Sequence, residues 1–426
     1  MLFGIAFAIS LNTIDSIFIK MVGTEQAAAL QFSFPVIMLI SSIAMGIGQG
    51  ASAVISRNYG SNNMDKVKRL TTDSLIIAVI LVALFVIIGF IFFDEIFQLQ
   101  GASSTMMPFI KEYMYIWMGG MIFLVIPFLG NSALRAIGDT KTPSLIMMVA
   151  VLINGILDPI MIFGLFGFPR LELQGAAIAT VIARMITLFA SLYFLKIKYN
   201  MLSSKIFDWK EFKVSFKEIM EVGLPAAITS VVIPFGIFIV NGFVQDYGVE
   251  AMAALNVASR FEMISLVVFM ALGSVLGPFI GQNFGANQTS RINDALKKSY
   301  IFSIVWGLLM IGLFYFIAEP LALFLDEEGE PKFVEYMIIY LSIIPFAISF
   351  RGINMLISTS FNVLKRPWYS MIISMSQMFI LFIPLAFYFS NQYGYSGILW
   401  ASVLASIITA IIGSIWLKSY FGKLFA

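Results

Sequence analysis

The chain contains neither cysteine nor histidine among its 426 residues, and only 12% of its residues are charged. Without cysteine it has no disulfide framework, no thiolate metal site and no redox-active thiol. Without histidine it lacks the commonest general base and metal ligand of proteins. Any proton handling must therefore be done by carboxylates.

Apolar residues are abundant instead. The hydrophobic fraction is 60% and the mean hydropathy is +0.93, whereas a soluble domain has roughly 45–50% apolar residues. No soluble core needs this much apolar surface, so the chain is predicted to lie in a membrane with lipid as its main partner. The net charge of +2 is too small to indicate a nucleic-acid partner.

Apolar runs of about 20 residues, the length that crosses a bilayer as a helix, predict twelve transmembrane helices. Prolines within several runs are expected to bend their helices, as proline lacks the amide hydrogen. These prolines are Pro35, Pro127, Pro159, Pro225, Pro234, Pro278, Pro345 and Pro384. The runs lie near 2–22, 27–55, 71–93, 109–134, 143–165, 175–196, 222–245, 250–280, 296–318, 333–360, 367–389 and 397–418.

The two halves of the chain repeat each other. The segment Gly23–Leu30 returns as Gly248–Leu255, and Asn58–Asn62 returns as Asn283–Asn287, both at an offset of 225 residues. A duplicated, membrane-embedded chain is typical of transporters built from two related bundles. We therefore predict an all-α membrane protein of twelve transmembrane helices in two pseudo-symmetric six-helix bundles.

The connecting loops alternate between basic and acidic or neutral. With twelve spans, every basic loop falls on the same side, and the positive-inside rule places both termini in the cytoplasm. The predicted domains are an N-terminal bundle over 1–196, a cytoplasmic linker over 197–221 and a C-terminal bundle over 222–426. Within the linker, Asp208–Glu221 mixes charged and aromatic residues, which predicts a helix lying along the membrane surface.

Six ionisable residues fall well inside the predicted spans. A charge near the bilayer centre costs about 3 kcal/mol on insertion scales, so such residues are paired or functional. We expect four of them to be structural charge partners on neighbouring helices: Arg184, Arg260, Glu262 and Arg351. Arg184 is also a candidate counter-charge for a carboxylate of the first bundle.

The remaining two acids, Asp15 and Asp158, predict an ion-coupling site. Asn154 and Asp158 are four residues apart and so share one helix face, while Pro159 leaves the carbonyl oxygen of Gly155 without its helical donor. With Asp15, these oxygens would bind a proton or a sodium ion. The alternative is that both acids only pair with Arg184. Neither acid has a counterpart in the second half, which favours a function over an architectural role.

Nothing in the sequence indicates an enzyme or a cofactor. The chain has no phosphate-binding loop of the Gly-x-x-x-x-Gly-Lys-Ser/Thr type, so direct use of ATP is not predicted. The energy for transport must then come from an ion gradient, with H+ or Na+ as the coupling ion.

Several motifs carry a family resemblance. They are Asp15-Ser-Ile-Phe-Ile, Gly50-Ala-Ser-Ala-Val-Ile-Ser56 with Tyr59-Gly60, Arg135-Ala-Ile-Gly138-Asp139-Thr-Lys-Thr-Pro143, Asn154-Gly-Ile-Leu-Asp158-Pro159, Gly175-Ala-Ala-Ile-Ala-Thr180, Arg260-Phe-Glu262 and Gln282-Asn283-Phe284-Gly285-Ala286. With them, the chain resembles the multidrug and toxic compound extrusion (MATE) family over its whole length.

The resemblance implies two six-helix bundles forming a V around a central cavity, and an antiporter that exports organic cations or other amphipathic compounds in exchange for H+ or Na+. Asp15, Asn154 and Asp158 match the DinF-like branch, whose working acids lie on the first and fifth helices, and Thr180 is a further candidate for that site. The NorM-like branch has acids on the seventh and tenth helices, and this sequence lacks them there.

Two other functions stay open on the sequence. A lipid-linked saccharide flippase of the same superfamily would have a more basic cavity and often fourteen spans. A scaffold or receptor would not need internal acids without symmetric partners. We expect a monomer in a prokaryotic inner or plasma membrane, with small amphipathic or cationic substrates.

Overall fold

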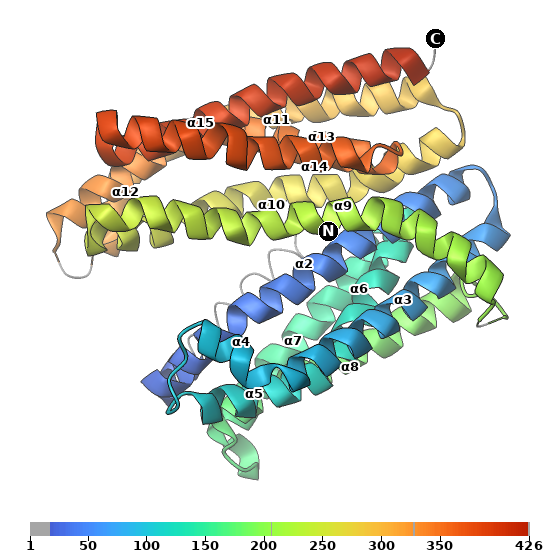
Figure 1. Cartoon of the computed structure of the whole chain (residues 1–426), viewed down its shortest axis with the longest axis horizontal. Helices are drawn as coiled ribbons and strands as arrows, with labels where there is room; N and C mark the ends of the chain where they lie inside the picture. Colours follow the sequence, from blue (N-terminus) through green and yellow to red (C-terminus); the bar gives the residue numbers. More distant parts are fainter. Residues whose placement is uncertain (1–17, 206, 327–328, 425–426) are drawn as a thin grey trace. The chain divides into compact units, whose positions relative to one another are not determined.

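Figure 1 shows a computed structural model of the chain. It describes residues 18–205, 207–326 and 329–424, and all regular secondary structure in these ranges is helical. The contacts divide the chain into two compact units, Met1–Ala227 and Ile228–Ala426. The segment 197–221, predicted as a separate linker, lies within the first unit, and α9 continues across the division.

The first unit packs its helices around one apolar core. Close contacts join α7 to α8, α2 to α6, and α6 to α8, and the core residues include Leu70, Met114 and Leu129. The helices are α2 (Thr24–Gly60), α3 (Met64–Ile91), α4 (Phe93–Leu99), α5 (Met107–Gly119), α6 (Met121–Ala136), α7 (Lys141–Phe163), α8 (Glu172–Tyr193) and the beginning of α9 (Trp209–Val244).

The second unit has its own core around α13, which packs against α10, α11 and α15. A π-helical segment, Ser376–Phe382, joins α14 to α15. The helices that follow α9 are α10 (Val249–Gly285), α11 (Thr289–Leu325), α12 (Pro331–Ile343), α13 (Pro345–Val363), α14 (Pro367–Met375) and α15 (Ile383–Leu424).

The predicted duplication is confirmed by the helix boundaries. Helices α2 and α10 both have 37 residues, and their first residues, like their last, are 225 positions apart. Each ends in a turn whose asparagine has a left-handed backbone, Asn62 with φ 57° and Asn287 with φ 56°, a conformation that asparagine tolerates better than most residues. Before each turn an asparagine amide donates to a carbonyl one turn earlier.

The fourth and tenth predicted spans, 109–134 and 333–360, are each two helices rather than one. The axes of α5 and α6 differ by 46°, and those of α12 and α13 by 48°. Two consecutive glycines, Gly119 and Gly120, lie at the first break. Pro345, which cannot donate to the carbonyl of Leu341, lies at the second. A four-residue turn closes each break, with a hydrogen bond from the amide of residue 123 to the carbonyl of residue 120 and from the amide of residue 347 to the carbonyl of residue 344.

The predicted spans correspond to the apolar helices of the structure. Within the described residues, eight helical stretches are long and apolar enough to cross a membrane, and the two bent pairs raise the number to ten. One stretch, Pro367–Phe421, has 55 residues, nearly three times the roughly 20 residues that cross a bilayer. It is interrupted at Gly394 (φ 63°, ψ −142°), which separates the predicted spans 367–389 and 397–418. Most of the first predicted span, 2–22, lies outside the described residues.

Of the segment predicted to lie along the membrane surface, Asp208–Glu221, all residues from Trp209 onward form the N-terminal part of α9. It is continuous with the seventh span instead of being a separate helix. Figure 1 shows α9 as one long ribbon.

Tyrosine hydroxyls form hydrogen bonds to corresponding turns in the two units. The hydroxyl of Tyr199 donates to Oδ2 of Asp139 at 2.5 Å, and the hydroxyl of Tyr420 donates to the carbonyl of Leu364 at 2.9 Å. Burial raises the pKa of Asp139, but hydrogen bonds from Thr142, Tyr199 and the Lys141 amide outweigh burial and leave that pKa below its usual value. The Asp139 turn is therefore held by a carboxylate that stays ionised.

We expect Gly50→Ala to destabilise the first unit. A Cβ at Gly50 would lie 2.7 Å from the amide nitrogen of Gly223 and closer still to the carbonyl oxygen of Ile219, so α2 and α9 would have to separate. Overpacking of this kind costs about 1–3 kcal/mol, which thermal unfolding of the purified protein in detergent would detect as a lower Tm.

The matched control is Gly312→Ala, because a Cβ at Gly312 in α11 meets no atom within 4 Å. Alanine favours a helix over glycine by up to about 1 kcal/mol, so this variant should keep or raise the Tm. Equal effects of the two substitutions would contradict the packing of α2 on α9.

Candidate functional site

The sequence-predicted pair Asn154 and Asp158 is buried within the first unit. Both residues lie on α7, and 5% of Asn154 and 1% of Asp158 are exposed. Nδ2 of Asn154 donates to Oδ1 of Asp158 at 2.8 Å. The four-residue spacing therefore brings the amide and the carboxylate together, as predicted from the helical repeat.

The backbone around this pair is polar as well. Pro159 is inside α7, so the carbonyl of Gly155 has no amide donor one turn later. Helix α8 packs closely on α7, because a Cβ at Gly175 would lie 2.6 Å from the carbonyl carbon of Met161. This antiparallel contact places half-buried Thr180 about level with the pair, although the described residues include no hydrogen bond to its hydroxyl.

The site predicted from the sequence also includes a carboxylate from the first span. Asp15 lies outside the described residues, so the sodium or proton site formed by Asp15, Asn154 and Asp158 stays a prediction. Within residues 18–205, 207–326 and 329–424, no group of three or more acidic side chains could hold a metal ion. Arg184 lies on α8 one turn beyond Thr180 and is half-buried.

A second charged cluster lies inside the second unit. The carboxylate of Glu262, on α10, is bound both by the guanidinium of Arg351, on α13, and by the hydroxyl of Tyr340, on α12. Nη2 of Arg351 also donates to Oγ of Ser402, on α15, at 2.7 Å. Four helices are thus connected through one ion pair next to a small cavity at the bend between α12 and α13.

The expected pairing of Glu262 and Arg351 with another helix of their own bundle is seen in the structure. Arg260 differs, because its side chain is exposed on α10 and makes no ion pair within the described residues. Arg260 and Glu262 are two residues apart, so the helix turns them to different sides. The interior of the second unit therefore contains the acid, and Arg260 projects away from it.

Two kinds of polar partner for the buried charged residues are not predicted from the sequence. Tyr340 and Ser402 are neutral residues in apolar runs, and nothing local indicates that they bind Glu262 and Arg351. Asp73 is fully buried, and its carboxylate binds Arg69 four residues earlier on α3. The four-residue spacing of opposite charges would have predicted this last pair.

A duplicated set of membrane-spanning helices, with buried charged side chains inside each unit, defines an integral membrane protein of the transporter class. Comparison of the chain with known proteins leads to the same class. The sequence matches the MatE family over residues 1–160 and 225–388, so the chain belongs to the MATE family of transporters.

Among its relatives, the FAD transporter of Shewanella oneidensis is 37% identical over 410 residues, covering 96% of this chain and 90% of the relative. The multidrug export protein MepA of Staphylococcus aureus is 25% identical over 390 residues, covering 91% and 84%. The crystal structure of the Vibrio cholerae MATE transporter VcmN in the bent form matches with a TM-score of 0.93 at 27% identity and covers 99% of this chain and 95% of VcmN. These relatives are transporters and not enzymes.

Removing one partner of the Glu262–Arg351 pair should destabilise the second unit. The Arg351→Met variant leaves a buried carboxylate without its cation, which costs about 3 kcal/mol and lowers the Tm by roughly 5–10 °C. The double variant Glu262→Gln, Arg351→Met should recover most of that loss, because neither charge remains. Thermal unfolding in detergent measures both.

Arg260→Met serves as the control on α10, since Arg260 has no ion pair within the described residues. Its Tm should stay within about 2 °C of the parent. If Arg351→Met unfolds at the same temperature as Arg260→Met, the ion pair does not stabilise the unit.

Proposed function

We propose that this transporter is a secondary active exporter, in which Asp158 binds the coupling H+ or Na+ and its release drives cargo out of a prokaryotic cell. The observation that carries the proposal is a carboxylate with 1% exposure, held by a neutral amide at 2.8 Å. The bacterial relatives and the predicted cytoplasmic termini support export across the inner or plasma membrane.

The chemistry follows from burial. An ionised carboxylate in a low-dielectric interior is unfavourable unless a cation neutralises it. The Asn154 amide orients Asp158 but brings no charge itself, so it is compatible with a proton or sodium ion bound at the carboxylate. A conformation that admits water to Asp158 would favour the ion-free form. The ion then shifts the equilibrium between two conformations by its different affinity for each.

Two classes of cargo have support. The 37% identical relative over 96% of the chain is named as an FAD transporter, which favours a flavin dinucleotide. The multidrug proteins YoeA of Bacillus subtilis and MepA are 27% and 25% identical, which supports amphipathic drugs and organic cations as the second candidate. None of these relatives has a name that refers to lipid-linked saccharides, so the flippase is the weaker alternative.

We expect Asp158→Asn to abolish ion-driven export. The asparagine keeps the size and hydrogen bonding of the side chain but cannot take up a proton, and it binds sodium less well. Cargo movement in vesicles under an imposed pH or sodium gradient should fall at least about tenfold, and comparison of the two gradients identifies the ion.

The control is Asp294→Asn, which removes an exposed carboxylate on α11. It should transport at the rate of the parent. Transport by Asp158→Asn at the parent rate, with equal protein in the vesicles, would exclude Asp158 as the coupling residue.

The cargo is tested with inside-out vesicles offered either FAD or the organic cation ethidium. We expect saturable, gradient-driven uptake of FAD, with little competition from ethidium, since the pyrophosphate of FAD is anionic and ethidium is cationic. Uptake of ethidium alone would assign the protein to multidrug export instead.

A further inference from the structure

The N-terminal part of α9 is an amphipathic helix with one face fixed to the first unit. Its buried side chains recur at helical spacing of three and four residues. They are Phe212, Ser215, Ile219 and Val222. This face therefore determines which side chains of residues 209–221 point away from the protein.

Two acidic side chains of this segment are paired with bases of the first unit. Glu211 Oε2 lies 3.5 Å from Nε of Arg69, and Glu218 Oε1 lies 2.6 Å from Nζ of Lys66. Both bases lie on α3. Asp208 accepts the Glu211 and Lys210 amides at the start of α9, and these hydrogen bonds lower its pKa.

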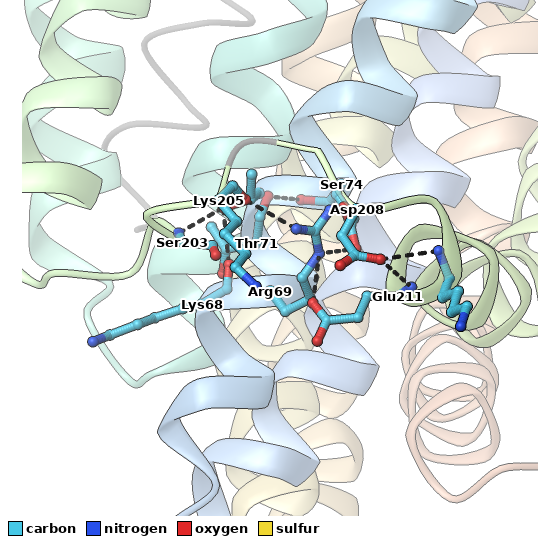
Figure 2. Close-up of polar contacts among 11 residues, drawn as sticks. Lys68, Arg69, Thr71, Ser74, Ser203, Lys205, Asp208 and Glu211 are labelled. Carbon is cyan, nitrogen blue, oxygen red and sulfur yellow. Dashed lines mark hydrogen bonds and ion pairs between the residues drawn. The ribbon is translucent and has the colours of Figure 1, made fainter.

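The chain just before α9 is also fastened to α3 (Figure 2). Nη1 of Arg69 donates to the carbonyl of Lys205 at 3.0 Å, and the amide of Ser203 donates to Oγ1 of Thr72 at 2.8 Å. Arg69 itself is buried and held by the carboxylate of Asp73. These contacts therefore fix the direction in which the outer face of α9 points.

Three lysines form a stripe along that outer face. Lys210, Lys213 and Lys217 are exposed, and their spacing of three and four residues places them on one side of the helix. None of them makes an ion pair with an acid in the part of the chain that the structure describes. Glu221, one turn after Lys217, is the acid nearest in sequence on this face, and the stripe stays positive.

Aromatic side chains border the lysines. Trp209 is 58% exposed and Phe216 is 43% exposed, and Nζ of Lys213 lies 5.1 Å from the centre of a Trp209 ring. Aromatic residues beside lysines are suited to the headgroup region, where the rings meet acyl chains and the ammonium groups reach phosphates. We call Lys210, Lys213, Lys217, Trp209 and Phe216 the α9 basic face.

The place of the α9 basic face along the helix indicates which kind of partner it meets. The helix continues without a break into the predicted seventh span at 222, so Lys217 lies only about 8 Å along the axis from the start of that span. The α9 basic face is thereby held at the depth of lipid headgroups.

We propose that the α9 basic face binds the phosphate groups of anionic phospholipids where α9 enters the membrane. Glu211 and Glu218 are engaged by Arg69 and Lys66, and the three lysines outnumber Glu221 on the outer face, so the net charge directed outward is positive. Each basic residue close to an anionic surface raises lipid partitioning about fivefold.

The test uses the full chain in mixed micelles with equal phosphatidylglycerol and phosphatidylcholine, followed by mass spectrometry of the lipids that remain bound after purification. We expect the parent to retain phosphatidylglycerol preferentially. The variant Lys210→Gln, Lys213→Gln, Lys217→Gln should lose this preference at least about tenfold, with an unchanged elution profile in size-exclusion chromatography.

The matched control, Lys297→Gln, Lys298→Gln, Lys332→Gln, removes the same charge from exposed lysines of the second unit and should keep the preference. Inorganic phosphate at the same concentration as the lipid should not displace phosphatidylglycerol, because it has no acyl chains for Trp209 and Phe216 to contact. Equal retention of both lipids by the parent, loss of preference only in the control variant, or displacement by phosphate would overturn the proposal.

Discussion

The buried hydrogen bond between Asn154 and Asp158 is the interaction on which the proposed transport chemistry depends. The amide orients the carboxylate without neutralising it, and it can do so whether or not an ion is bound. In the second unit the buried acid Glu262 is bound by a guanidinium and a phenol, which complete its charge and hydrogen bonding. A carboxylate already neutralised by a fixed guanidinium gains little from a small cation, so the Glu262 cluster contributes to the cohesion of the second unit.

The two units share a framework but not their chemistry. The 225-residue offset aligns Glu262 with Ile37, and the offset of 223 that aligns Asn131 with Asn354 places Phe128 at the position of Arg351. The helix ends, the turns after α2 and α10 and the paired bends are repeated, whereas the buried ionisable groups are not. Helix packing therefore tolerates either an ion pair or apolar side chains at these positions, which leaves each half free to acquire a different polar site.

Much of the fold follows from local signals in the sequence. Residues Gly23 and Gly248 precede α2 and α10, while Asn62 and Asn287 adopt the left-handed turn after them, so the repeat predicts matching helix ends.

The bends within helices are harder to predict from the sequence. Pro345 lies at a 48° break, but Pro127 sits inside continuous α6, because packing decides whether a helix bends at a missing hydrogen bond. The Glu262 cluster joins residues up to 140 positions apart and includes neutral Tyr340 and Ser402, which hydropathy does not distinguish from their surroundings.

The breaks in the fourth and tenth spans affect how strongly these helices resist bending. At each one a short turn from residue 120 to 123, or from 344 to 347, replaces regular helix, and a side chain at Gly119 would meet no neighbouring atom within 4 Å. Helical backbone resists bending because it must give up hydrogen bonds, and part of that resistance is already absent at these two places. Each bundle thus has a bend at an equivalent position, where fewer backbone hydrogen bonds oppose a change in the direction of the helix axis.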